Sequence, residues 1–248
     1  MARIGAIKLG FGLLGDALTG RLIRDLRGES RIPLEEGMIG GLRYRFARDL
    51  MAQRTEPDGT IWASRGYLLY RRPPSGDAFL LEDRLPCPLT AAWMGRFARV
   101  RRYVHRYDLV DVFPLASGGH LAFSGGRVYR REAGERSWQE VQRLSRWGPG
   151  VGRGIRSQAL VQTSAGTIFY GEYFHNPAND PVRLWASDDD GRRWRVAYEF
   201  PAGATRHVHS LQEDPFTGRL WVCTGDANDA SIVGWLDPAA GRIAVVGT

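Results

Sequence analysis

Three residues in two polar segments of the chain carry side chains suited to acid–base chemistry. Glu172 and Tyr173 begin the polar segment 172–180, and Asp226 begins the segment 226–231. Two carboxyl groups can serve as the acid and the base of glycoside hydrolysis, and a tyrosine beside a glutamate is a known exception to that pairing. Glu172, Tyr173 and Asp226 are therefore the candidate catalytic residues. An ion pair of Glu172 with Arg156 and a packed ring at Tyr173 are the structural alternatives.

Polar and basic residues near these three could hold an anionic sugar, because arginine binds carboxylates bidentately. The candidate substrate-binding residues are Arg153, Arg156, His175, Asn176, Arg206, His207, His209, Asn228 and Asp229. His207 and His209 alternate along a predicted strand, so both side chains point the same way and suit a metal site completed by Asp226. No further ligand follows at a recognisable spacing, so we predict no metal and no cofactor, and hydrogen-bonded structural histidines instead.

The elements that must position these residues repeat along the chain. A glycine is followed two residues later by an aliphatic residue four times, at intervals of 60, 47 and 52 residues: Gly59/Ile61, Gly119/Leu121, Gly166/Ile168 and Gly218/Leu220. In three units an aromatic residue is followed nine positions later by another, namely Tyr70/Phe79, Tyr129/Trp138 and Trp185/Trp194. Four strands in about 50 residues is the unit of a propeller blade. We therefore predict an all-β fold, a β-propeller of four-stranded blades with about four blades visible, either complete or part of a larger propeller.

Antiparallel strands sort the polar residues between the two faces of such a fold. Loops between the second and third strands emerge beside the connectors that lead into each first strand, and we call this side the connector face. All candidate catalytic and binding residues are predicted to lie there. Loops carry function disproportionately and ligands bind in concave mouths, so the connector face is the expected site.

The segment 187–194 carries a recognisable motif. It reads Ser-Asp-Asp-Asp-Gly-Arg-Arg-Trp and fits the pattern Ser-x-Asp-x-Gly-x-x-Trp. It resembles the Asp-box, or BNR repeat, of sialidase-like β-propellers, with Ser187, Asp189, Gly191 and Trp194 at the motif positions. Such a motif is structural: the serine and aspartate bond the hairpin backbone, the glycine takes a positive φ, and the tryptophan packs between sheets.

The resemblance covers about residues 58–248 and implies a glycan-directed protein. One form of this expectation is a glycoside hydrolase acting on an anionic sugar. The alternative is a noncatalytic propeller that binds a glycan or a protein partner through the connector face. Sialidases of this superfamily have six blades, whereas four units are visible here, so the resemblance implies a fold more firmly than a reaction.

The N-terminal residues differ in pattern from the repeats. Apolar residues at Ile4, Ile7, Phe11 and Leu14 recur every three or four positions, which indicates a helix. We predict an amphipathic helical appendage over residues 1–37 and the propeller over 38–248. Contact of residues 1–28 with a membrane surface is the less favoured alternative to packing against the main domain or a partner.

Composition limits the classes of partner and compartment. The net charge is +7, but the arginines run along the whole chain without clustering, so no nucleic-acid partner is expected. The two cysteines are too few for a disulfide framework, and no signal peptide or long apolar run is evident, so a cytoplasmic location is expected. The expected partners are a carbohydrate or other small anionic ligand, with a protein partner as the alternative.

Overall fold

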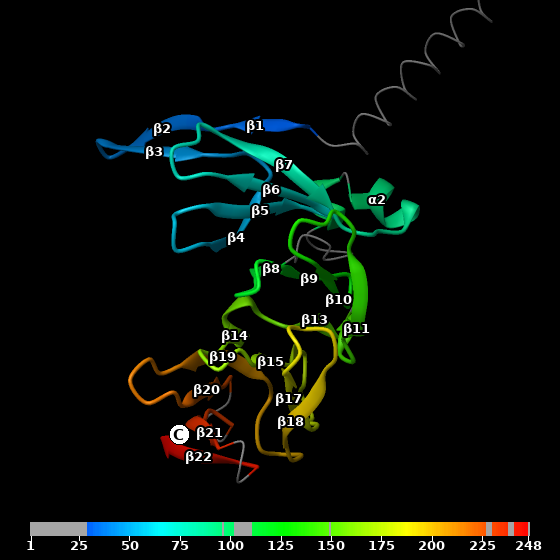
Figure 1. The fold of residues 1–248 in the computed structure, drawn as a ribbon, viewed down its shortest axis with the longest axis vertical. Coiled ribbons are helices and arrows are strands. Elements are labelled where there is room, and N and C mark those ends of the chain that lie inside the picture. The colour runs from blue at the N-terminus through cyan, green and yellow to red at the C-terminus, as the bar shows by residue number, and fades with distance from the viewer. Residues whose placement is uncertain are drawn as a thin grey trace, which may run out of the picture. The chain divides into compact units, whose positions relative to one another are not determined.

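The structure is a computed structural model that describes residues 29–95, 97–101, 111–148, 150–226, 230–237 and 241–247. The predicted helix within residues 1–28 and the candidate residues Asn228 and Asp229 lie outside this part. The chain divides into two compact units, Met1–Arg101 and Arg102–Thr248, which are described one at a time (Figure 1). Among the described residues, no helix has the length and apolar character needed to cross a bilayer.

The first unit is built on a five-stranded antiparallel sheet in the order β1-β7-β6-β5-β4. Its strands are β1 (Arg31–Pro33), β4 (Met51–Thr55), β5 (Ile61–Arg65), β6 (Leu68–Arg72) and β7 (Ala78–Arg84). A separate hairpin joins β2 (Glu35–Ile39) to β3 (Leu42–Phe46), and the helix α2 (Leu89–Gly95) follows the sheet.

The predicted helical appendage is wrong over its last residues. Arg31–Pro33 forms β1, which pairs with β7, and the hairpin strand β2 begins at Glu35. Ile32 is buried between exposed Arg31 and Pro33, which is the two-residue alternation of a strand at a sheet surface. Three residues are too few to distinguish a helical period from a strand period, so this segment could not be separated from the apolar pattern before it.

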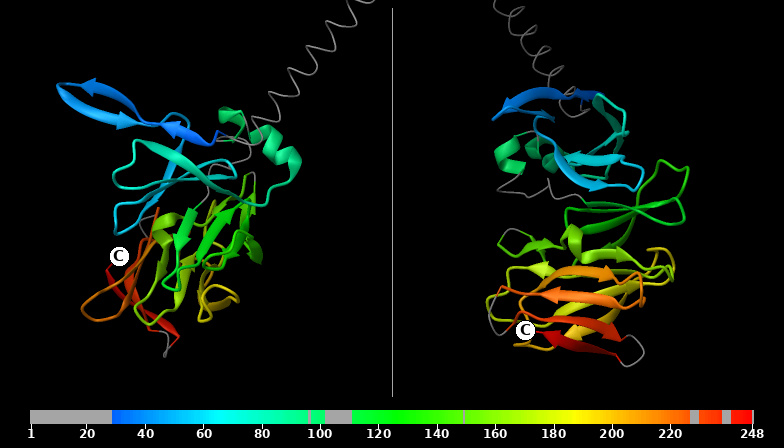
Figure 2. Two further views of the ribbon diagram at one scale, coloured as in Figure 1. Left: turned by 45° about the horizontal axis from the view of Figure 1, so that its top comes forward. Right: turned by 90° about the vertical axis from the view of Figure 1, so that its left-hand side faces the viewer.

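The described part of the second unit contains three four-stranded antiparallel sheets, in the orders β11-β10-β9-β8, β14-β15-β17-β18 and β19-β20-β21-β22. The strands are β8 (Asp111–Pro114), β9 (His120–Ser124), β10 (Arg127–Arg131) and β11 (Gln139–Arg143); β14 (Leu160–Gln162), β15 (Ile168–Gly171), β17 (Val182–Ser187) and β18 (Arg195–Phe200); and β19 (Val208–Glu213), β20 (Leu220–Thr224), β21 (Val233–Asp237) and β22 (Arg242–Gly247). A smaller sheet joins β12 (Trp147–Gly148), β13 (Gly152–Gly154) and β16 (Tyr173–Phe174), and the 3-10 turn η2 (Ser157–Ala159) precedes β14. Figure 2 shows the strands of the last sheet, coloured orange to red, lying side by side.

The predicted all-β fold class is confirmed. The run β4 to β7 and the three sheets of the second unit are four successive four-stranded antiparallel units of the propeller-blade type, at the positions of the four sequence repeats. The repeated glycines mark the tight turn before each second strand: Gly166, for example, has a φ of 89°, where a side chain would be strained.

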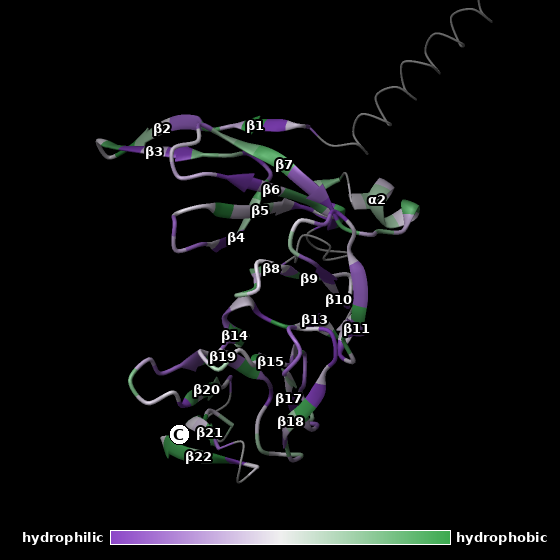
Figure 3. Cartoon of the chain, viewed as in Figure 1, coloured by the Kyte–Doolittle hydropathy of each residue, from purple (hydrophilic) through white to green (hydrophobic). Residues whose placement is uncertain are grey.

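Apolar side chains form the core between the sheets of the second unit. Val182, Leu184 and Ala186 of β17 pack with Val208 of β19 and Val222 of β20, and all five are fully buried. Their alternation along β17 is the pattern of a strand with one face buried against the next sheet. Figure 3 shows hydrophobic residues along β15 and β22. This packing fixes where the ends of β15, β16, β19 and β20 meet.

Candidate functional site

A cleft of about 320 Å³ lies in the second unit, where residues around β13, β16 and β19 converge. Its lining residues are Gly150, Val151, Gly152, Arg153, Tyr173, Phe174, His175, His207 and Asp226. Five of these were named from the sequence as catalytic or binding candidates: Arg153, Tyr173, His175, His207 and Asp226. The structure thus brings together residues that are up to 73 positions apart in the chain, the difference between 153 and 226.

The backbone at the start of β19 positions the two histidines. His207 precedes the strand, and the pairing of β19 with β20 shifts register between Val208 and Ser210, which leaves His209 at a β-bulge. Bulges re-aim side chains and are frequent beside active sites. The two imidazole rings are 4.9 Å apart, and their Nε2 atoms are 3.1 Å apart. Both histidines therefore point to the same side, as their alternation predicted.

Gly171 allows the end of β15 to approach this strand closely. A Cβ at Gly171 would lie 2.5 Å from the side chain of Val208. The Val208 amide donates a hydrogen bond of 3.0 Å to the Glu172 carbonyl oxygen, which ties the segment after β15 to β19. This close approach places Tyr173 beside His207.

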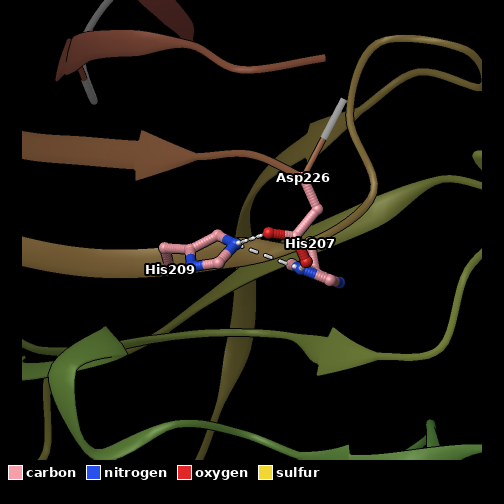
Figure 4. Close-up of side chains that lie close together, drawn as sticks. All are labelled: His207, His209 and Asp226. Carbon is pink, nitrogen blue, oxygen red and sulfur yellow. Dashed lines mark hydrogen bonds and ion pairs between the residues drawn. The ribbon is translucent and has the colours of Figure 1, made fainter. Parts of the chain in front are cut away.

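Asp226 completes a compact cluster with the two histidines (Figure 4). Its Oδ2 lies 2.8 Å from His207 Nε2, and its Oδ1 lies 3.2 Å from His209 Nε2. Asp226 follows β20 after one glycine and has a φ of 78°, a left-handed conformation that aspartate tolerates better than most residues. His207 is buried, whereas about half of the Asp226 side chain is exposed.

Two further hydrogen bonds fix the protons on the histidines. The Nδ1 of His207 lies 3.0 Å from the Phe174 carbonyl oxygen, which only accepts, so Nδ1 carries a proton and donates. Arg156 has only donors, and its Nη1 lies 3.1 Å from Nδ1 of His209, so that atom accepts. A neutral His207 therefore presents a lone pair at Nε2, toward Asp226.

Burial and charge act in opposite directions on the cluster. Burial lowers the pKa of His209, and the nearby Asp226 carboxylate only partly offsets this effect. Burial alone would raise the pKa of Asp226, but the hydrogen bond and charge of His207 outweigh it and hold that pKa below its usual value. The surroundings thus favour the charged form of the Asp226 carboxyl group and the neutral form of the His209 imidazole.

Tyr173 and Arg156 form the wall beside the cluster. The Tyr173 ring lies 4.2 Å from the His207 ring, between centroids, and is tilted by 42°. The Arg156 guanidinium lies 5.0 Å from the centroid of the Tyr173 ring, within the range of a cation–π contact. Arg156 thus contacts both Tyr173 and His209, and Tyr173 is both a packed ring and part of the cleft lining.

Glu172 points away from the cleft. It is buried, and its Oε1 accepts hydrogen bonds from the Ser145 hydroxyl at 2.6 Å and the Trp185 indole at 3.2 Å. Its Oε2 accepts from the backbone amide of Arg183 at 3.0 Å. Successive side chains of an extended segment point to opposite sides, so Glu172 and Tyr173 do not both face the cleft. The predicted partner Arg156 is engaged elsewhere.

The remaining candidates divide into loop supports and cleft residues. The Asn176 amide is buried and closes its own loop: it donates to the carbonyl oxygens of Asp180 and Arg206 and accepts from the Asp180 amide. The backbone carbonyl of Arg206 accepts one of these hydrogen bonds, and the Arg206 side chain is not among those that line the cleft. Arg153 and His175 are exposed at the cleft.

The segment 187–194 forms the hairpin between β17 and β18, and its side chains bond the turn. The Gly191 amide donates to the Ser187 hydroxyl at 2.9 Å, and the Arg193 amide donates to the Asp189 carboxylate at 2.8 Å. Gly191 has a φ of 83°, and the Trp194 indole donates to the Gly191 carbonyl at 3.1 Å. None of these residues lines the cleft, so their role is local support of the hairpin.

The sequence interpretation missed the backbone that forms the floor of the cleft. Gly150, Val151 and Gly152 line it, and a Cβ at Gly152 would lie 2.8 Å from the Phe174 Cα. Alternating glycines at 148, 150, 152 and 154 were the available signal, because glycine marks places where two backbones approach closely.

Comparison with known proteins gives structural neighbours only. No protein-family model matches the chain, and no curated protein resembles it in sequence. Similar solved structures include the extracellular domain of a protein described as a one-component system from B. thetaiotaomicron, with 11% identity, a TM-score of 0.48, and coverage of 88% of this chain and 28% of that one. A second is regucalcin, a calcium-binding protein from Agrobacterium tumefaciens, with 12% identity, a TM-score of 0.48, and coverage of 82% of this chain and 62% of that one. A third is a chain of the nidogen/laminin complex, with 10% identity, a TM-score of 0.48, and coverage of 88% of this chain and 77% of that one. These neighbours are β-propellers, and this chain spans less than two thirds of the length of the first two named.

Proposed function

We propose that this chain is a glycan-directed propeller protein that binds an anionic sugar in the cleft of its second unit. The observation that carries the proposal is the charge distribution of that cleft. Arg153 and His175 are exposed along it, and the one acidic residue among its described lining, Asp226, is already paired with His207. An incoming carboxylate would therefore meet the exposed guanidinium of Arg153, which can bind it bidentately, without facing an unpaired negative charge among the described lining residues.

Binding without turnover is favoured over hydrolysis. Hydrolysis by the usual route needs two carboxyl groups on either side of the scissile bond. Glu172 holds three structural hydrogen bonds away from the cleft, which leaves Asp226 without a second carboxyl group among the described lining residues. The sialidase-like resemblance rests on the hairpin 187–194, whose hydrogen bonds follow the pattern that the motif implies. This hairpin is structural, and the glycan as ligand class is carried over from the sequence resemblance as part of the proposal.

The test is titration calorimetry of the purified chain with glucuronic acid and N-acetylneuraminic acid, with neutral glucose as the uncharged probe. Removing a charged hydrogen-bonding group costs about 1.5–3 kcal/mol, which is about tenfold or more in affinity. Arg153→Gln should therefore weaken binding of the two acids by about tenfold or more. Arg143→Gln is the matched control, because it removes an exposed arginine of β11 outside the cleft.

Fluorogenic glycosides of the same sugars, incubated with the parent protein, separate binding from turnover. Saturable binding of an acidic sugar that depends on Arg153, with no release of fluorophore, is the expected result. Equal losses in Arg153→Gln and Arg143→Gln, or no binding of any acidic sugar by the parent, would refute the proposed function.

A further inference from the structure

We propose that His207, His209 and Asp226 form a binding site for one divalent transition-metal ion at the edge of the cleft. The sequence interpretation placed a metal second to structural histidines. The atomic arrangement reverses that order, and this inference stands apart from the proposed sugar binding because it concerns the metal alone. Three side chains each offer one donor atom, and these atoms lie within 4.8 Å of one another.

The separations between the three donor atoms match those of ligands on one metal ion. Zinc is bound by histidine nitrogen and carboxylate oxygen at about 2.0–2.2 Å, so two ligands at a right angle are about 3.0 Å apart and two at the tetrahedral angle about 3.4 Å apart. The observed separations are 3.1 Å between the two Nε2 atoms, and 2.8 and 3.2 Å from them to the Asp226 oxygens. The last two distances end on different oxygens, Oδ2 and Oδ1, and one donor atom from each of the three side chains lies within 4.8 Å of the other two (Figure 4).

The proton positions leave one lone pair available to a cation at this point. Because His207 donates through Nδ1 to the Phe174 carbonyl, its Nε2 has a lone pair when the ring is neutral. That lone pair faces an Asp226 oxygen at 2.8 Å, and the proton that lies near both acceptors is the one on His209 Nε2, 3.1 Å from His207 Nε2. A metal ion that takes the place of this proton would be bound by both acceptors. A backbone carbonyl on the far nitrogen is also the usual second-shell partner that orients a metal-binding histidine.

Arg156 sets the condition under which His209 joins the site. His209 can bind a metal through Nε2 only when its proton is on Nδ1, and that tautomer accepts nothing from Arg156. Metal binding therefore displaces the 3.1 Å contact between Arg156 Nη1 and His209 Nδ1. The guanidinium keeps its place against the face of Tyr173, so losing this contact does not leave it without a partner.

The donor set selects the class of metal. Two imidazoles and one carboxylate suit zinc, cobalt, nickel or ferrous iron, and this combination with open positions is the facial arrangement of non-haem iron sites. Calcium and magnesium need mainly oxygen ligands, so they are excluded as occupants. His207 and Asp226 line the cleft, and the remaining coordination positions would be filled from there by water or by an anionic oxygen of a ligand.

The experiment is titration of the chelator-treated full chain with zinc by calorimetry and with cobalt by visible absorption. The expected result is one equivalent of zinc bound, ligand-field absorption bands with cobalt, and no heat with magnesium. Asp226→Asn and His209→Gln should each weaken zinc binding at least tenfold, since losing even a second-shell partner costs about 10- to 100-fold. Zinc should also raise the Tm of the parent, because it binds only the folded site.

Two matched variants guard against misinterpretation. His120→Ala removes an imidazole of β9 that does not line the cleft, and it should bind zinc as the parent does. Arg156→Leu removes the competing hydrogen bond and a nearby positive charge, so its affinity for zinc should equal or exceed that of the parent. If the parent binds no stoichiometric zinc, a second proton on His207 fills the gap instead and the proposal fails. Parent-like binding by both Asp226→Asn and His209→Gln, or a tenfold loss in Arg156→Leu, would overturn it as well.

Discussion

Glu172→Gln distinguishes a catalytic carboxylate from a structural one, and the structure predicts a loss of stability. Three donors surround the two oxygens of Glu172: the Ser145 hydroxyl, the Trp185 indole N–H and the Arg183 amide. Glutamine offers one oxygen and one NH2 group. If its oxygen takes the place of Oε1, the NH2 group faces the Arg183 amide; if it is turned around, the NH2 group faces the Trp185 N–H. Either way a buried N–H is left without an acceptor.

The size of the loss follows from these contacts. An unsatisfied buried donor costs about 1–3 kcal/mol, and the bonds that remain lose the charge that makes them about twice as strong. The free energy of unfolding of Glu172→Gln should therefore fall by about 2–4 kcal/mol. Ser145→Ala removes one donor and leaves both oxygens with a partner, so its loss should be about 1 kcal/mol.

The assay is urea denaturation followed by tryptophan fluorescence, with the cleft titrated by the acidic sugars in the same preparations. A lower denaturation midpoint with an unchanged slope indicates lost stability in an otherwise similar fold. Sugar affinity should stay within about twofold in the folded fraction, a change of about 0.4 kcal/mol. A variant with the midpoint of the parent and abolished binding or turnover would refute the reasoning and return Glu172 to the site.

Three further outcomes test other parts of the structure. Burial opposes ionisation of Asp189, but hydrogen bonds from the Arg193 amide and the Ser187 hydroxyl outweigh it and lower the pKa of this carboxyl group. The charged carboxylate therefore stabilises the fold fully above about pH 4, the usual aspartate pKa, and this stabilisation is lost as the pH falls through the lowered pKa. Acid denaturation of Asp189→Asn should lack this pH-dependent component, and a profile identical to that of the parent would contradict the assignment. Arg101 is buried and donates hydrogen bonds to the Gly95 carbonyl and to Asp49. Arg101→Met should therefore lower the free energy of unfolding of the first unit by about 2 kcal/mol, measured by urea denaturation. A loss below half of that value would show that these contacts are dispensable. Burial raises the pKa of the Cys87 thiol to about 11. Iodoacetamide should therefore alkylate Cys87 slowly at pH 8 in the folded protein and rapidly in urea, as measured by mass spectrometry. Equal rates of alkylation in the two conditions would argue against the burial of this thiol.

Much of the architecture follows from the order of residues alone. The glycine repeats and the paired aromatics placed four four-stranded units, because a strand has a two-residue period and a tight turn needs glycine at fixed positions. The same patterns are insensitive to short segments, so β1 at Arg31–Pro33 was absorbed into a predicted helix, and α2 was not foreseen.

The candidate site was foreseen in part, for a reason visible at Glu172 and Tyr173. Both residues were named from the sequence as catalytic candidates, and both were predicted to lie on the connector face. The side chains of neighbouring residues in an extended segment point to opposite sides, so the two cannot both face the cleft. His207, His209 and Asp226 were grouped correctly by strand alternation and loop order. The bulge at His209, and the contact of Gly171 with Val208 that places Tyr173 beside His207, were not evident.

The sequence by itself thus determined the type of fold, the strands, and the side chains able to do chemistry, since these depend on local period and residue type. Only the tertiary structure decided which of those side chains meet. It turned Glu172 inward to three donors, left Arg153 exposed at the cleft, and aimed two imidazole Nε2 atoms and a carboxylate at one point. Such choices depend on how neighbouring sheets pack and where each polar atom finds a partner, which are properties of the assembled core rather than of any segment.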